Sequence, residues 1–362
     1  MIMSKTDLKS LSKGEIFDFA GSHGLPRYRA AQIIHWIYKK HASSIDEITE
    51  FSKELRKALE ELAFISCIKL AKRLISSDGT EKFLFSLDDG RLIESVLIQD
   101  KSRLTLCISS QVGCALGCRF CRTGKLGLTR NLKSHEILDQ VIAVNRILAG
   151  QEVSTARPPL SGNNGRAFSP RKITNIVFMG MGEPLMNFDE VVEALWKIVI
   201  FTGISRRKIT LSTAGILPKF PLLPQRAPEI NLAVSLNATT ESSRSEIMPV
   251  NRKYPLAALI GACKKFPLGP GRRITFEYIM IKGVNDTHLD ARRIVKMLRG
   301  IRCKINLIPL NHDEQGGFKP SSEKKILEFQ KILVGDKITA FIRRSKGGDI
   351  CAACGQLASG QH

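Results

Sequence analysis

The sequence lacks any apolar stretch long enough to cross a membrane, and its polar start, Met1–Asp7, lacks the apolar core of a signal peptide. These two absences favour a cytoplasmic protein that acts without a membrane. Cysteine is also scarce: nine residues, an odd number, are spread along 362 positions. In a reducing compartment cysteines serve metal binding or catalysis more often than disulfides. We interpret Cys67, Cys263 and Cys303 as small apolar core residues.

Acidic residues are few compared with basic ones. The chain has 34 Asp and Glu against 55 Lys and Arg, a formal net charge of +21 and a pI near 9.8. Such an excess favours a polyanionic partner, because neutralising phosphates releases counterions. A membrane surface would instead require the basic residues to follow one amphipathic stripe, whereas here they are scattered. RNA or DNA is therefore the expected partner.

Residues 1–77 are predicted to form a helical module. Apolar residues recur at helical spacing around Ile33 and around Leu59, and Ser52 is a suitable N-cap for the second helix. Two basic clusters occur in the loops, Pro26-Arg27-Tyr28-Arg29 and Lys39-Lys40-His41. They suit an RNA-binding surface, but they suit a solvated charged face equally well.

Residues 78–102 are predicted to form a β-hairpin extension around the turn Asp88-Asp89-Gly90. From residue 103 to about 345, short apolar runs alternate with helical patterns. The six runs expected to be strands are Leu104–Ser109, Ile173–Met179, Ile209–Ser212, Leu232–Leu236, Ile274–Ile281 and Ile305–Ile308. Six consecutive βα units predict an α/β fold with a partial (β/α)6 barrel, whose sites lie at the carboxyl ends of the strands. Residues 151–170 interrupt this pattern as a Pro-, Gly- and Ser-rich insertion, and residues 346–362 form a separate C-terminal segment.

The run Cys114-Ala-Leu-Gly-Cys118-Arg-Phe-Cys121 follows the first of these strands. It offers three thiolates and no fourth in the same loop. Three soft ligands suit an iron–sulfur cluster with one iron open to a substrate or cofactor. A zinc knuckle that borrows Cys107 or His135 as the fourth ligand is the alternative.

Polar residues follow the other strands. Gly180-Met181-Gly182-Glu183-Pro184 comes after the second strand, where glycines allow close backbone approach and the carboxylate can accept hydrogen bonds from an amine. Ser212, Ser235 and Asn237 end the third and fourth strands, and Asn311 follows the sixth. Each alone suits an ordinary turn, but together they predict a site at one rim of the barrel.

With these motifs the chain resembles the radical S-adenosylmethionine (SAM) enzymes, and among them the RlmN/Cfr family of RNA methyltransferases. The resemblance covers nearly the whole sequence. Its segments are Cys107–Cys121, Arg130–Leu132, Gly180–Pro184, Leu211–Thr213, Ser235–Asn237, Ile247–Asn251, Asn306–Asn311 and Ala353–Leu357.

The resemblance implies the chemistry. Cys114, Cys118 and Cys121 would hold one [4Fe-4S] cluster. Residues implied to contact SAM are Gly182, Glu183, Ser212, Ser235, Leu236, Asn237 and Asn311. Cys354 would accept a methyl group, Cys107 would resolve the covalent intermediate, and Glu94 would accept a proton, with two SAM molecules used per turnover.

The implied substrate is C2 of an adenosine in the peptidyl-transferase region of 23S rRNA, and also an adenosine in a tRNA anticodon loop. A flavodoxin or ferredoxin would donate electrons. Cfr-type methylation of C8 on the same adenosine is the alternative within the family. A non-catalytic metal-containing RNA-binding protein is the alternative outside it.

Two residues depart from the family pattern. Asn237 stands where many members have histidine, and it keeps the capacity for hydrogen bonding. Cys351 lies three residues before Cys354, where many members have no thiol, and it creates a second candidate acceptor. Cys354 is the expected acceptor because the surrounding Ala-Cys-Gly-Gln-Leu is the part that matches. A Cys-x2-Cys pair also suits a redox couple or half a zinc site.

Overall fold

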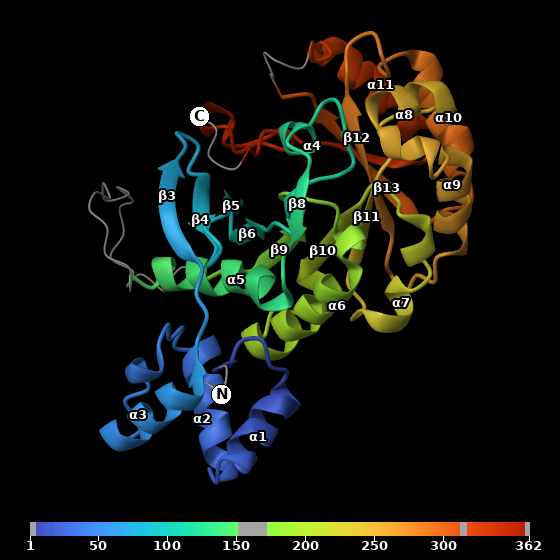
Figure 1. Cartoon of the computed structure of the whole chain (residues 1–362). Helices are drawn as coiled ribbons and strands as arrows, with labels where there is room; N and C mark the ends of the chain where they lie inside the picture. Colours follow the sequence, from blue (N-terminus) through green and yellow to red (C-terminus); the bar gives the residue numbers. More distant parts are fainter. Residues whose placement is uncertain (1–4, 151–171, 312–316, 359–362) are drawn as a thin grey trace.

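The computed structural model describes residues 5–150, 172–311 and 317–358, so the predicted insertion at 151–170 lies outside the described residues. Its main element is a ten-stranded sheet in the order β14-β13-β12-β11-β10-β9-β6-β5-β4-β3 (Figure 1). The sheet has a parallel part and an antiparallel part, which meet at β6.

The parallel part confirms the predicted partial α/β barrel. Its strands are β6 (Arg103–Cys107), β9 (Asn175–Phe178), β10 (Ile209–Thr213), β11 (Asn231–Ser235), β12 (Ile274–Met280), β13 (Cys303–Pro309) and β14 (Thr339–Ile342). The first six coincide with the predicted runs. The edge strand β14 was not predicted, because four residues with one exposed phenylalanine give little periodic signal.

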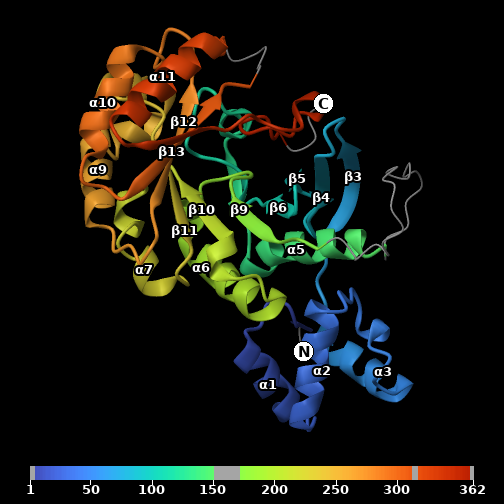
Figure 2. The same ribbon diagram turned by 180° about the vertical axis from the view of Figure 1, so that it is seen from behind.

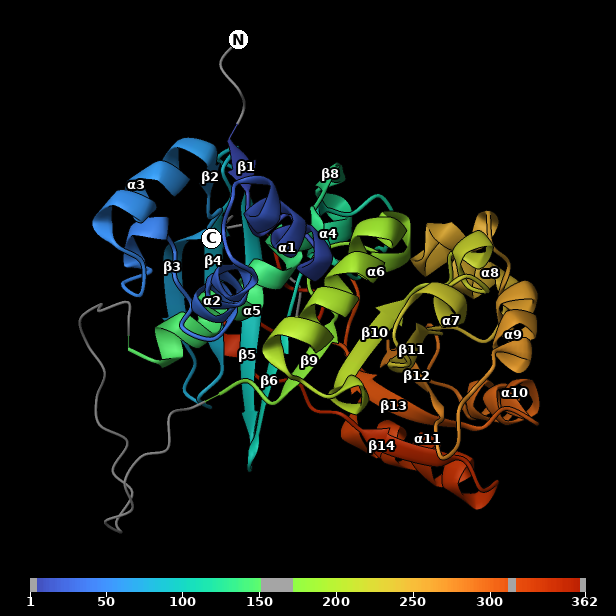
Figure 3. The same cartoon turned by 90° about the horizontal axis from the view of Figure 1, so that it is seen from below.

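Helices cover the outer face of this curved sheet (Figure 3). They are α5 (Ser134–Leu148), α6 (Phe188–Lys197), α9 (Leu256–Lys265), α10 (His288–Leu298) and α11 (Glu323–Gly335). On β12, Phe276 and Tyr278 are fully buried, and the Tyr278 ring stacks on Phe329 of α11 at 5.5 Å. Burying one such side chain stabilises the fold by about 1.5–3 kcal/mol. The alternate residues Thr275 and Glu277 line a cavity on the inner face.

The antiparallel part contains the predicted hairpin, β4 (Glu81–Ser86) and β5 (Leu92–Asp100). A further strand, β3 (Lys69–Ile75), pairs with β4 at the sheet edge. Its sequence, Lys-Leu-Ala-Lys-Arg-Leu-Ile, has no period-two alternation, and the strand is half-buried or exposed. For this reason the strand was not predicted. Shorter elements near the barrel are β7 (Gln111–Gly113), α4 (Arg122–Lys125), β8 (Leu128–Asn131), α7 (Leu223–Arg226) and α8 (Glu241–Ile247).

The first residues form a small helical module at one side of the barrel (Figures 1 and 2). It consists of α1 (Lys13–Ser22), α2 (Arg27–Tyr38), α3 (Lys53–Leu62) and the short paired strands β1 (Thr6–Asp7) and β2 (Ala63–Phe64). The Ser52 side chain caps α3 by accepting from the Leu55 N–H, as predicted. Within the described part of the chain, no helix combines the length and apolarity needed to span a bilayer.

A buried ion pair joins this module to the barrel. Lys9 Nζ lies 2.5 Å from Asp139 Oδ1 on α5, and both side chains are almost fully buried. The second carboxylate oxygen accepts from the Ile68 N–H at 2.7 Å. Asp139 is therefore satisfied by a charged partner and a backbone donor from the module.

We expect Asp139→Ala to lower the free energy of unfolding by about 3–5 kcal/mol, because the substitution leaves the Lys9 ammonium buried without its counter-charge. Urea unfolding followed by circular dichroism measures this. Asp46→Ala is the matched control, since Asp46 pairs with Arg56 at 2.9 Å but is 77% exposed. Its expected cost is about 1 kcal/mol or less. Equal losses in the two variants would contradict the structural role of the buried pair.

Candidate active site

The three motif cysteines lie on the loop between β7 and α4. The Cys114 N–H donates to the Gly127 carbonyl at 2.8 Å, and the Cys121 N–H to the Cys118 carbonyl at 3.0 Å. Gly124 packs so closely that a Cβ there would lie 2.9 Å from the Cys118 nitrogen. Burial raises the pKa of all three thiols, and for Cys118 the other two thiols raise it further. This mutual influence indicates that the three sulfurs lie close together.

The donor set on this loop suits an iron–sulfur cluster. His135, the alternative fourth ligand of a zinc knuckle, lies 3.7 Å from Asp7 of the helical module. Three soft thiols on one loop are the ligand set expected of a cluster with one open iron.

The segment Gly180–Pro184 packs against residues 108–111, which lead into the cysteine loop. Gly182 has φ +99°, and a Cβ there would lie 2.5 Å from Cβ of Gln111, so only glycine fits without strain. The Glu183 N–H donates to the Gln111 side chain at 2.8 Å. The buried Glu183 carboxylate raises the pKa of Cys114 and Cys118, which indicates that it lies near their sulfurs.

Three donors hold the Glu183 carboxylate in place. It accepts from the Thr213 hydroxyl at 2.6 Å, the Ala214 N–H at 2.8 Å and the Leu185 N–H at 3.0 Å. Burial raises the pKa of this carboxyl group despite these bonds. Two oxygens carry about four acceptor positions, so one remains for a ligand such as an ammonium group.

Four further predicted SAM contacts lie at the ends of β10 and β11. Ser212 and Ser235 are half-buried, while Leu236 is fully buried. Asn237 has φ +55°, and its side chain accepts from the Ile279 N–H at 2.9 Å and donates to the Met248 sulfur at 3.3 Å. Asparagine and histidine are both enriched in this left-handed conformation, which accounts for either residue at the position.

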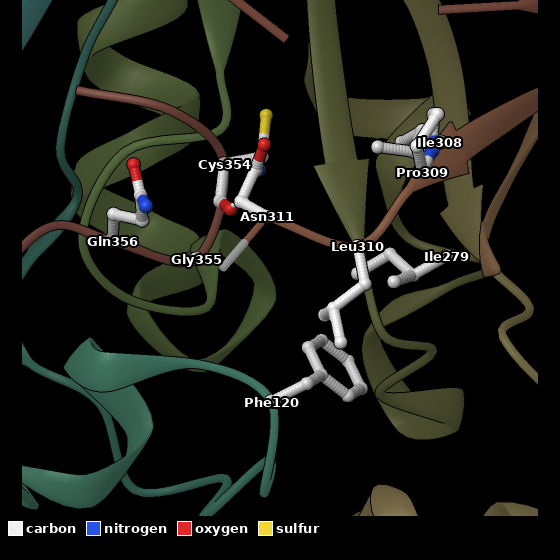
Figure 4. Close-up of a pocket in the computed structure, with 9 residues that line it drawn as sticks. All are labelled: Phe120, Ile279, Ile308, Pro309, Leu310, Asn311, Cys354, Gly355 and Gln356. Carbon is white, nitrogen blue, oxygen red and sulfur yellow. Dashed lines mark hydrogen bonds between the residues drawn. The ribbon is translucent and has the colours of Figure 1, made fainter. Parts of the chain in front are cut away.

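The C-terminal segment lies across the same end of the barrel. Backbone and side-chain donors from the helix after the cysteines hold it: the Arg122 N–H donates to the Gly355 carbonyl at 2.8 Å, and the Thr123 hydroxyl to the Leu357 carbonyl at 2.7 Å. Asn311 donates to the Cys354 carbonyl at 2.9 Å, and the two residues lie side by side in Figure 4. The segment is thus fixed directly beside the cysteine loop.

A cavity of about 630 Å³ opens on the inner face of the sheet and extends to this segment. Alternate residues of the strands line it, as expected from the period of two in a strand. Its lining includes six basic side chains against two acidic ones; the basic ones are Arg103, Lys208, Lys304, Arg343, Arg344 and Lys346. Cys107, Cys121 and Cys354 also line it. Such a cavity suits an anionic substrate.

Cys107 and Cys354 share this cavity but differ in exposure. Cys107 is buried, and burial together with the neighbouring Cys354 raises the pKa of its thiol to about 12. Cys354 is exposed. Arg343 lies near both, since the two sulfurs raise the pKa of its guanidinium. The structure therefore brings the two predicted catalytic cysteines together.

Alkylation should distinguish the two thiols. We expect iodoacetamide to modify the exposed Cys354 first and Cys107 among the last, because Cys107 is buried and its raised pKa keeps it from forming the reactive thiolate. With a pKa near 12, the rate at Cys107 should rise about tenfold per unit from pH 7 to pH 9 without a plateau. Peptide mass spectrometry after timed labelling measures both rates, with urea-unfolded chain as control. A plateau near pH 8 at Cys107 would contradict the burial of this thiol.

The structure places Glu94 apart from the cavity lining. Its buried carboxylate lies 3.3 Å from Lys82 Nζ and accepts from the Ala358 N–H at 2.9 Å. Cys351 is likewise outside the lining; its sulfur lies 3.8 Å from an Arg122 nitrogen, and its carbonyl accepts from Lys82. Glu94 and Lys82 thus hold the C-terminal segment in this conformation.

Three of the residues that hold the segment, Lys82, Arg122 and Thr123, were not predicted from the sequence. None belongs to a spacing that indicates chemistry, and their partners are backbone carbonyls more than two hundred residues away. For Arg122 and Thr123 the one available signal was their position in the sequence directly after Cys121. Lys82 had no such signal.

Comparison with known proteins gives consistent results. Residues 6–65 match the family described as "Ribosomal RNA large subunit methyltransferase N-terminal domain". The chain is 48% identical to "Dual-specificity RNA methyltransferase RlmN" of Geobacter sulfurreducens over 353 residues, 97% of this chain and 91% of the relative. It is 45% identical to the protein of the same name from Pelobacter propionicus, over 98% of this chain and 96% of the relative. The crystal structure of a radical SAM methyltransferase from Sphaerobacter thermophilus is 39% identical, with a TM-score of 0.89 and coverage of 98% and 99%.

Proposed function

Since the chain belongs to the RlmN family of radical SAM RNA methyltransferases, we propose that it methylates C2 of an adenosine in 23S rRNA and an adenosine in the tRNA anticodon loop. The observation that carries this proposal is the placement of Cys354 beside the motif cysteines, in a basic cavity that also contains Cys107. A non-catalytic RNA-binding protein would have no need of that arrangement.

The residues of the site suit the two cofactors of the family. Cys114, Cys118 and Cys121 would hold one [4Fe-4S] cluster. The carboxylate of Glu183, with the rim residues Gly182, Ser212, Ser235, Leu236, Asn237 and Asn311, would hold SAM. When bound, these groups would supply the methyl group and the one-electron chemistry that an electron-poor aromatic carbon requires. A flavodoxin or ferredoxin is the proposed source of the electron.

Cys354 is the proposed methyl acceptor. Its thiolate would attack the sulfonium methyl, so that a sulfur–carbon bond forms on Cys354 and the bond to the SAM sulfur breaks. The exposed sulfur and the carbonyl held by Asn311 support this role, because the acceptor must face both SAM and RNA. Glu94 is the proposed acceptor of the adenine proton. To reach the adenine it would have to separate from Ala358 or act through water.

Cys107 is the proposed resolving residue. Its thiolate would attack the Cys354 sulfur, forming a disulfide while the bond from sulfur to the transferred carbon breaks. The electron pair of that bond stays with the carbon, which takes a proton and becomes the methyl group of the product. A shared cavity and mutual electrostatic influence of the two sulfurs support this step.

Cys107→Ala should therefore leave a covalent protein–RNA adduct. We expect product formation to fall below detection while an RNA-linked species accumulates, because methyl transfer to Cys354 does not need Cys107. Denaturing gel electrophoresis with labelled RNA measures the adduct. Cys67→Ala, which alters a cysteine of the helical module, serves as control and should form no adduct. Normal turnover by Cys107→Ala would contradict the assignment.

Nucleoside analysis tests the reaction itself. The chain is expressed in a host lacking its own enzyme, and nucleosides from 23S rRNA and tRNA are compared by mass spectrometry with C2- and C8-methyladenosine standards. The C2 product is expected in both RNAs. The C8 product would instead identify Cfr-type chemistry, and absence of both would overturn the proposed function.

A further inference from the structure

Arg244 on α8 is the largest fully buried side chain of the described residues. Its guanidinium makes four hydrogen bonds. It donates to the Ala214 carbonyl at 2.8 Å, the Ser235 carbonyl at 3.0 Å, the Leu236 carbonyl at 3.1 Å and the Asn251 side chain at 2.9 Å. Ala214 follows β10, and Ser235 ends β11, so one cation joins the carboxyl ends of two neighbouring strands.

These contacts are made with residues that also form, or hold, the proposed SAM site. Ala214 donates its N–H to Glu183, while its carbonyl accepts from Arg244. Ser235 and Leu236, whose carbonyls Arg244 holds, are themselves proposed SAM contacts. A small displacement of these carbonyls would therefore move the carboxylate and the rim that hold the cofactor.

In the described part of the chain no ion pair cancels the charge of Arg244. Its hydrogen-bond partners there are backbone carbonyls and one side-chain amide, and Glu241 acts on it only at longer range. Burial lowers the pKa of the guanidinium to about 10, which still leaves it charged at neutral pH. The cysteine loop also touches α8 directly, because the N–H of Arg119, the residue after Cys118, donates to the carbonyl of Ile247 at the end of this helix at 3.0 Å. Cys118 opposes the shift of the Arg244 pKa, in agreement with this closeness.

We propose that Arg244 is a positioning residue that fixes the carboxyl ends of β10 and β11 in the geometry for SAM and places a positive charge beside Cys118. A buried cation favours any added negative charge nearby, because few water dipoles screen it. Arg244 therefore makes the cluster held by the three cysteines easier to reduce. This inference rests on the proposed cluster and SAM site.

Three variants distinguish the effect of the Arg244 hydrogen bonds from the effect of its charge. Arg244→Gln removes both the charge and most of the hydrogen bonds. Arg244→Lys keeps the charge but cannot reach four acceptors at once. Arg272→Gln is the matched control, since Arg272 holds the Glu229 carbonyl and the Asn231 side chain at the opposite, amino end of β11. Each protein is reconstituted with iron and sulfide without oxygen.

The measurements are the midpoint potential of the cluster, from a redox titration followed by electron paramagnetic resonance, and the SAM dissociation constant from the SAM-induced change in that spectrum. For Arg244→Gln we expect a more negative potential and about 10–100-fold weaker SAM binding, as for other residues that orient ligands. For Arg244→Lys we expect a nearly unchanged potential with weakened SAM binding. Arg272→Gln should change neither.

Two results would overturn the inference. One is a folded Arg244→Gln with unchanged potential and SAM affinity. The other is an Arg244→Lys variant whose melting temperature falls while its potential and SAM affinity stay unchanged, as expected for a purely structural residue. If Arg244→Gln does not fold, the result for Arg244→Lys alone decides between the two roles. A wild-type chain that assembles no cluster or binds no SAM would instead contradict the proposed function.

Discussion

Cys118→Ala is expected to abolish both the cluster and methylation. Anaerobic reconstitution should incorporate about four irons per chain into the wild type and almost none into the variant, because a cluster held by two thiolates is not retained. The Cys118 sulfur interacts with both other motif thiols and lies near Glu183 and Arg244, so its loss affects the whole ligand set. Iron analysis and the absorbance of the cluster measure the loss, and RNA methylation should fall below detection.

Cys303→Ala is the matched control for this substitution. Cys303 begins β13 at the amino end of the strands, opposite the motif loop, and is half-buried. The control should keep its iron and its activity, apart from a small loss of stability. Full iron content in Cys118→Ala would show that the cluster binds elsewhere.

Cys354→Ala is expected to eliminate methylation of both protein and RNA, whereas Cys351→Ala should reduce it only slightly. Cys354 lines the cavity, while Cys351 lies outside the lining and its sulfur is close to Arg122. Incubation with SAM labelled in its methyl group, followed by peptide mass spectrometry, locates the methylated residue. If Cys354→Ala stayed active and Cys351→Ala did not, the acceptor would be Cys351.

Both variants remove a thiol from the same four-residue stretch, Cys351–Cys354, so each controls for disturbance of the segment by the other. Neither substitution alters the backbone bonds at Arg122 and Thr123. A difference between them therefore reports on the sulfur and not on the position of the segment.

Much of the barrel was predictable because its signals are local. Strands such as β12 are apolar along their length, and α10 carries Ala291, Ile294 and Leu298 at helical spacing, so each was recognised within about ten residues of sequence. The same holds for the cysteine loop, whose spacing indicates its chemistry without reference to the rest of the chain.

Features built from distant segments were not predictable. From the sequence, Arg244 is an ordinary polar residue of a short helix. It is buried because four hydrogen-bond acceptors from three separate segments surround its guanidinium. Lys82 and Glu94 alternate with apolar residues in strands and would ordinarily face water. They are buried because the C-terminal segment covers them. The strands β3 and β14 are edge strands with weak patterns, and their pairing depends on neighbours that are already in place.

The bonds from Arg122 and Thr123 to the residues around Cys354 couple two distant parts of the chain. Both donors stand immediately after the third motif cysteine, so the loop that would receive iron also anchors the tail of the polypeptide. A shift of this loop would therefore also shift the backbone on either side of Cys354, so that a substitution in the loop can misplace the acceptor thiol without touching the C-terminal segment.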